Sequence, residues 1–114
     1  MKQRLIVMNG QKLLQNEGAG EWVTTKVDKA GALRPGLYNL YAAATADPHK
    51  VHEGIILYAD GDHVFQQAGN TVIKHPLDTF ETVPEPGKLT QIQYVAGKAE
   101  VVIAAARRGR GISR

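Results

Sequence analysis

Short apolar runs alternate with turn dipeptides through the centre of the chain. Between residues 52 and 75 the runs are rich in Ile, Val, Phe and Tyr, and Asp60-Gly61 and Gly69-Asn70 separate them. Dipeptides of this type between β-prone runs are the strongest short-range signal for β-hairpins. The pattern therefore predicts three consecutive antiparallel strands.

Two-residue turns fix the expected register of these strands. The first turn pairs Tyr58 with His63, and the second pairs Gln66 with Ile73. Side chains alternate across a strand, so the register defines two faces. One face is expected to form the core and carries Ile55, Leu57, Val64, Gln66, Ile73 and His75. Its polar side chains would need hydrogen-bond partners inside the protein. The opposite face carries Ile56, Tyr58, His63, Phe65, Gln67, Val72 and Lys74. This face is either covered by the N-terminal hairpin or serves as a binding surface.

The rest of the chain repeats this rhythm. Asn9-Gly10 is a type I′ turn signal, and Ala96-Gly97 marks the bend of a last hairpin. Further strands are expected over residues 4–8, 11–15, 21–27, 37–41, 88–95 and 98–105. Eight or nine short strands with regular turn signals predict an all-β fold with little helix. We expect a small barrel or sandwich, SH3-like or related, built from consecutive antiparallel hairpins.

Length and composition limit the class of protein. A chain of 114 residues is long enough for one modest core, so we expect a single β domain over residues 1–106. No apolar run reaches the length of a membrane span, and the apolar segment near the N-terminus is too short for a signal peptide. The absence of cysteine excludes disulfides and thiol catalysis. We therefore expect a cytoplasmic protein.

The basic charge is concentrated at the C-terminus. The formal net charge is +3, and the last eight residues contain four arginines, Arg107, Arg108, Arg110 and Arg114. Without them the body carries about −1, which is not the footprint of a strong nucleic-acid binder. We expect residues 107–114 to be a disordered tail that could contact nucleic acid.

The polar residues do not indicate catalysis. No pair among the four histidines, His49, His52, His63 and His75, has the helical spacing of a metal site. Ser113 lies in the tail, and the carboxylates do not converge in sequence. We therefore expect no metal, no other cofactor and no enzymatic activity; a metal-dependent enzyme is the least supported hypothesis.

Several residue runs resemble a known family. They are Gly-Leu-Tyr-Asn-Leu-Tyr at residues 36–41, His-Glu-Gly-Ile-Ile at 52–56, Val-Phe-Gln-Gln at 64–67 and Val-Ile-Lys-His at 72–75. Together they resemble the KfrB-like domain of proteins encoded on conjugative plasmids. The resemblance implies a non-enzymatic accessory protein of a mobile element, acting in plasmid maintenance, transfer or counter-defence. The distinctive polar residues of the resemblance are His52, Gln66, Gln67 and His75. For these residues a structural role is favoured over a role in recognition.

Two binding hypotheses follow. In the first, the chain binds a protein partner encoded by the mobile element or the host, through an open strand edge or through a face made of Ile56, Tyr58, His63, Phe65 and Lys74. An open edge could also pair two copies into a homodimer. In the alternative, a small β-barrel binds nucleic acid through the arginine-rich tail and exposed aromatics, for which the candidates are Tyr38, Tyr41, Tyr58 and Phe65. Trp22 is expected to be a buried anchor and not a base-stacking residue.

Overall fold

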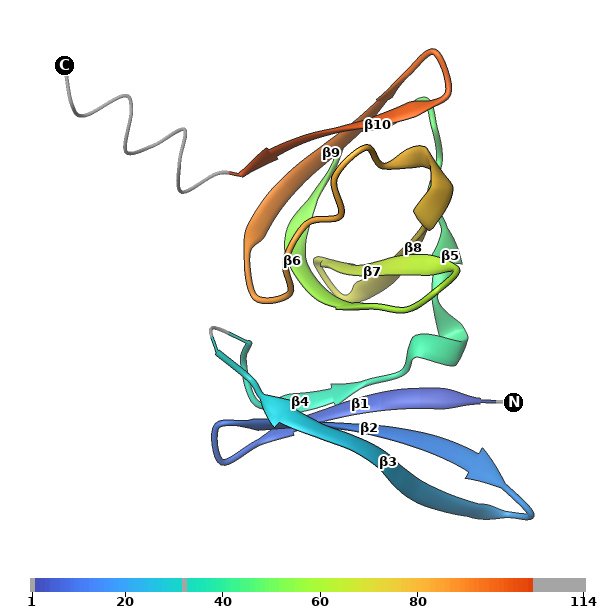
Figure 1. Ribbon diagram of the computed structural model, residues 1–114, viewed down its shortest axis with the longest axis vertical. Helices are drawn as coiled ribbons and strands as arrows, with labels where there is room; N and C mark the ends of the chain where they lie inside the picture. Colours follow the sequence, from blue (N-terminus) through green and yellow to red (C-terminus); the bar gives the residue numbers. More distant parts are fainter. Residues whose placement is uncertain (1, 32, 104–114) are drawn as a thin grey trace, which may run out of the picture. The chain divides into compact units, whose positions relative to one another are not determined.

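The computed structural model describes residues 2–31 and 33–103 and is built from β-strands (Figure 1). Its residues form two compact units, Met1–Ala43 and Ala44–Arg114. Two short 3₁₀ segments are the helical elements of the described residues, so the all-β prediction is confirmed. The expected domain boundary at residue 106 and the arginine-rich tail lie outside the described residues.

The first unit is a four-stranded antiparallel sheet of order β3-β2-β1-β4. Its elements are β1 (Gln3–Met8), β2 (Gln11–Gly18), β3 (Glu21–Lys29), β4 (Gly36–Tyr38) and the 3₁₀ segment η1 (Leu40–Ala42). Asn9 and Gly10 have φ values of 53° and 74°, as a type I′ turn requires. The predicted first hairpin is thereby confirmed.

Alternation divides this sheet into a buried and an open face. Leu5 pairs with Leu14 on one side and with Tyr38 on the other, and all three side chains are buried. The next residue of each strand points to the opposite face. On that face four apolar side chains form a row across the strands, in the order Val27, Leu13, Ile6 and Leu37. The side chains at the two ends of this row, Val27 and Leu37, are each 53% exposed.

The second unit is a six-stranded sheet of order β10-β9-β6-β7-β8-β5. Its elements are β5 (Ala44–Thr45), β6 (His52–Ala59), β7 (His63–Ala68), β8 (Thr71–Pro76), η2 (Leu77–Thr79), β9 (Leu89–Val95) and β10 (Lys98–Ile103). All neighbours are antiparallel except β5 and β8. The order has two ends, so these strands do not form a continuous closed barrel, although an isolated parallel bridge joins Phe80 to Ala99.

The two central hairpins differ in how well their register was predicted. In the β7–β8 hairpin Gln66 pairs with Ile73 and Val64 with His75, as expected. In the β6–β7 hairpin Tyr58 pairs with Phe65 instead of His63. The prediction was wrong because the loop closes between Asp60 and His63, and because a bulge interrupts the pairing between Ile56 and Tyr58.

The bulge changes which β6 residues form the core. A shift of one residue transfers side chains to the other face of a sheet. Ile56 therefore pairs with Gln66, is 0% exposed, and forms a core cluster with Val64 and Ile92. Its predicted place on the opposite face was wrong. Leu57, at the bulge, is also fully buried.

Candidate functional site

Gln66 is the centre of a buried polar network in the second unit. Its Nε2 donates to the carbonyl oxygens of Thr90 at 2.8 Å and Gly54 at 3.2 Å, and lies 3.3 Å from that of His52. Carbonyls only accept, so the amide nitrogen faces β6 and β9 and the amide oxygen faces β8. One side chain of β7 thus joins three neighbouring strands of the sheet.

His75 continues the network on β8. Its Nε2 lies 2.8 Å from Gln66 Oε1, an acceptor, so Nε2 carries the proton. Nδ1 then accepts a hydrogen bond from the Tyr94 hydroxyl at 2.7 Å. Burial, with a smaller contribution from His52, lowers the pKa of His75 from 6.5 to about 4. The ring is therefore neutral at physiological pH, as both hydrogen bonds require.

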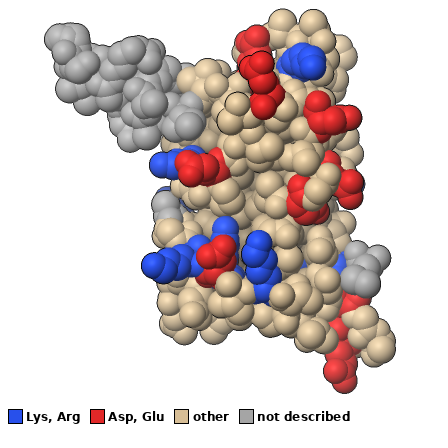
Figure 2. Space-filling view, viewed as in Figure 1, with Lys and Arg blue, Asp and Glu red and all other residues tan. Residues whose placement is uncertain are grey.

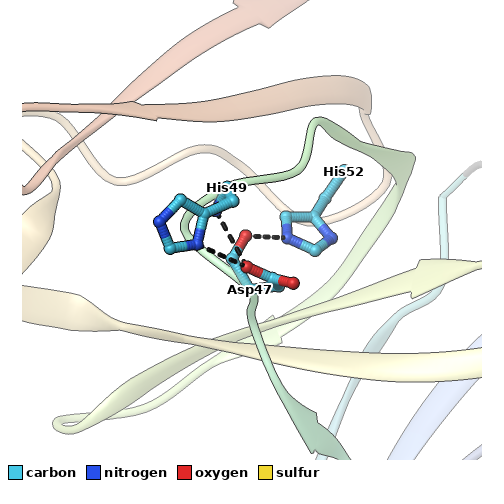
Figure 3. Close-up of polar contacts among 3 residues, drawn as sticks. All are labelled: Asp47, His49 and His52. Atoms are coloured by element: carbon cyan, nitrogen blue, oxygen red, sulfur yellow. Dashed lines mark hydrogen bonds and ion pairs between the residues drawn. The ribbon is translucent and has the colours of Figure 1, made fainter.

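His52 connects the network to the loop before β6 (Figure 3). Its ring meets the His75 ring edge-on, with centroids 5.3 Å apart. Its Nε2 donates to the Asp47 carbonyl at 2.9 Å, and Asp47 Oδ1 accepts the His49 backbone N–H at 2.9 Å. This backbone hydrogen bond is the main reason that the pKa of the Asp47 carboxyl is lowered. The loop is thus held by its own turn and by the sheet.

These contacts bring together three of the four polar residues on which the resemblance rests. His52, Gln66 and His75 converge in the interior, whereas Gln67 alternates to the opposite face of β7. Sequence reasoning missed Thr90 and Tyr94. A signal existed, because Thr90, Ile92 and Tyr94 recur with the period of two that marks one face of a strand.

The predicted docking face is only partly present. Tyr58, His63, Phe65 and Lys74 share a face of the sheet, but Ile56 belongs to the core. Phe65 is 5% exposed, since the Tyr58 and His63 rings lie against it with centroids 6.4 and 6.0 Å away. Ile56 and Phe65 are therefore not surface contacts, a correction to the expected face. Tyr58, His63 and Lys74 remain partly exposed.

A surface groove lies beside His63 in the second unit. Its volume is about 710 Å³, and its lining comes from the β6–β7 turn, η2 and the segment after η2. The lining residues are Gly61, Asp62, His63, Pro76, Leu77, Asp78, Phe80 and Val83. The apolar side chains come from the segment 76–83, which includes η2, while Asp62 and Asp78 are exposed. The groove is therefore apolar with an acidic edge.

Backbone hydrogen bonds hold one wall of the groove. Asp60 Oδ1 accepts the backbone N–H groups of Asp62 and His63, each at 2.8 Å. Pro76 pairs with His63, and the Leu77 N–H donates to the Asp62 carbonyl at 2.9 Å. A preorganised wall lowers the entropic cost of binding.

The remaining predictions from the sequence concern metal binding, a membrane span and the arginine-rich tail. Within residues 2–31 and 33–103 no group of three His, Cys, Asp or Glu side chains could hold a metal ion. No helix in this part of the chain is long and apolar enough to cross a membrane. Arg107, Arg108, Arg110 and Arg114 lie outside the described residues.

Two comparisons with known proteins give matches. A family model described as KfrB Domain matches residues 51–103, which include the whole polar network and the groove. Protein TraB of Escherichia coli is 35% identical over 103 residues, covering 87% of this chain and 70% of TraB.

Proposed function

The chain belongs to the KfrB domain family of conjugative-plasmid accessory proteins, and we propose that it acts by binding a protein partner and not by catalysis. A plasmid-related role comes with the family. The partner, the docking mode and a cytoplasmic site of action are parts of the proposal. The observation that carries it is the apolar, acid-edged groove beside His63.

The groove indicates the chemistry of its occupant. Leu77, Phe80 and Val83 offer apolar surface to a partner side chain. Asp62 and Asp78 favour a neighbouring Lys or Arg on the same partner. Residues 44–103 contain eight Asp and Glu against four Lys and Arg, so this part of the second unit has a net negative charge that attracts a cation. We therefore expect a short segment with an apolar anchor beside a basic residue.

A peptide array tests this proposal. The labelled full chain is applied to peptides of about 15 residues that tile the other proteins of the same plasmid, enough to occupy a groove of this size. The bound peptides should share an apolar residue flanked by Lys or Arg. Reversing both edge charges, Asp62→Lys with Asp78→Lys, should weaken their binding about ten-fold or more.

The matched control is Glu85→Lys, an exposed acidic residue of the same unit that does not line the groove. It should leave the array pattern unchanged, and all three proteins should keep the same thermal transition. Binding that falls equally in both variants would mean a general charge effect. That outcome, or an array without any bound peptide, would refute groove docking.

The other proposed mode, strand addition, would use the outer edge of β10, where an isolated bridge already joins Ala99 to Phe80. This strand ends the sheet and its Val102 is 40% exposed. Edge β3 is less suitable, because a register irregularity interrupts its pairing with β2 and it carries Lys26, Asp28 and Lys29. The homodimer expected from an open edge stays a prediction.

A further inference from the structure

The first unit and the described part of the second unit carry opposite formal charges. Residues 1–43 contain six Lys and Arg against three Asp and Glu, a net +3, whereas residues 44–103 carry a net −4. The view in Figure 2 shows basic side chains over the strands β1–β4 and mainly acidic ones over the strands of the second unit. The body is therefore not uniformly near-neutral, and its basic half is a separate candidate for polyanion binding.

Arg4 on the open face of the first sheet is held in a fixed position. Its guanidinium carbon lies 4.0 Å from the centroid of the Trp22 ring. Its Nε donates to Gln15 Oε1 at 2.8 Å, and Gln15 Nε2 donates to Thr24 Oγ1 at 3.0 Å. Stacking and the Nε bond fix the plane of the guanidinium and leave its two terminal amino groups for a ligand.

No carboxylate pairs with Arg4 among the residues that the structure describes, where the ion pairs are Lys2 with Glu17 and His49 with Asp47. A preorganised guanidinium without an acidic partner suits a phosphate, which two N–H groups can bind side by side. An anion at this point would complete the contacts of Arg4.

Aromatic surface lies next to this cation. Tyr41 in η1 is 48% exposed, and its ring centroid is 6.2 Å from that of Trp22. Lys2 Nζ lies 5.2 Å from the Tyr41 centroid and 4.0 Å from Glu17, a long ion pair. Lys2 can therefore move to a phosphate and leave the Tyr41 ring open to a base.

We propose that these residues, Lys2, Arg4, Gln15, Trp22, Thr24 and Tyr41, form a binding site for single-stranded nucleic acid, here called the Arg4 patch. Arg4 and Lys2 bind successive phosphates, and a base stacks on Tyr41. A duplex keeps its bases stacked inside and could use only the cations. An acidic peptide would likewise gain nothing from the exposed ring. The combination of cation and ring therefore favours a single strand.

The sole tryptophan of the chain gives a direct readout of this patch. The full chain is titrated with oligo-dT and oligo-U of about 15 nucleotides at about 50 and 150 mM salt. Binding should change the Trp22 emission and weaken with salt. The two oligonucleotides show whether the strand is DNA or RNA. A duplex and poly-glutamate are the competitors, and both should bind more weakly than the single strands.

Variants locate the contacts. Arg4→Gln and Tyr41→Ala should each weaken binding about ten-fold, whereas Tyr41→Phe, which keeps the ring, should stay within about two-fold. Arg34→Gln is the matched control, because it removes an exposed cation of the same unit outside the patch. These variants are compared in full chains whose arginines at 107, 108, 110 and 114 are replaced by glutamine, so that tail binding does not hide the patch.

Three outcomes would overturn the proposal. Nucleic-acid binding that is lost when the tail arginines are replaced, and that does not change when Arg4 or Tyr41 is replaced, would assign the binding to the tail. Equal binding of poly-glutamate would assign the patch to acidic peptides. Absence of any change in Trp22 emission with either oligonucleotide, while the thermal transition stays normal, would mean that no strand binds there.

Discussion

At the scale of single residues, Gln66 connects more of the second unit than any apolar side chain of its size could. It bonds to backbone groups of β6 and β9 and to the His75 ring of β8. Buried polar groups that lose their partners retain their desolvation cost. Gln66 is therefore a structural residue, and its replacement leaves several such groups unpaired.

We predict that Gln66→Leu lowers the free energy of unfolding by about 3 kcal/mol or prevents folding. Gln67→Leu is the control, because Gln67 is the next residue of the same strand and lies on the other face, partly exposed. It should change stability by less than about 1 kcal/mol. Urea unfolding followed by circular dichroism measures both. Equal losses of stability in the two variants would show that the buried network contributes no more to stability than the partly exposed Gln67 does.

His75 supplies a pH prediction with a defined sign. Its pKa is lowered from 6.5 to about 4 in the folded chain. Between these values the unfolded chain binds more protons at His75 than the folded chain does, so stability rises with pH. The contribution is complete above about pH 6.5 and is lost progressively as the pH falls towards 4.

An NMR titration of the histidine ring signals checks this directly. His75 should remain neutral down to about pH 5. A His75 signal that titrates near 6.5 would contradict the buried, neutral ring.

At the scale of elements, Gly54 sets the closeness of β6 and β7. A Cβ at this position would overlap the carbonyl oxygen and carbon of Gln67. We predict that Gly54→Ala separates the two strands and costs about 3 kcal/mol or more. Gly61→Ala, in the turn of the same hairpin with open space around it, should be nearly neutral. Thermal unfolding of both variants tests the difference; equal effects would contradict the steric explanation.

Phe65 tests the corrected docking face. Because its side chain is 5% exposed, we predict that Phe65→Ala costs about 3–5 kcal/mol. The exposed Val83, in the groove, should tolerate replacement by Ser with little loss of stability. Differential scanning calorimetry separates the two. An unchanged transition for Phe65→Ala would restore Phe65 as a surface contact.

The two central hairpins show how far the elements could be predicted from the sequence. Gly69-Asn70 forms the expected two-residue turn, so the pairing from Gln66 to Ile73 was correct. Asp60-Gly61 does not, because the Asp60 carboxylate accepts two backbone N–H groups and lengthens the loop. The bulge after Ile56 depends on packing across strands, which local sequence does not specify.

At the scale of the whole molecule, the sequence predicted the net charge but not how the charges are distributed over the fold. The surplus of arginine near the C-terminus was evident, whereas the opposite net charges of residues 1–43 and 44–103 become apparent only when the division of the chain after Ala43 is known. The Arg4 patch was missed for a similar reason. Arg4, Trp22 and Tyr41 are far apart in sequence and meet only through the pairing of β1, β2 and β3 and the position of η1.

An amide NMR titration of the full chain with the tightest-binding array peptide tests groove docking most directly. The largest shifts are predicted at the amides of the non-proline residues that line the groove, which are Gly61, Asp62, His63, Leu77, Asp78, Phe80 and Val83. In the Asp62→Lys, Asp78→Lys chain the same peptide should cause only small shifts there. Shifts concentrated on β1–β4, or on the exposed edge of β10, would contradict docking in the groove beside His63.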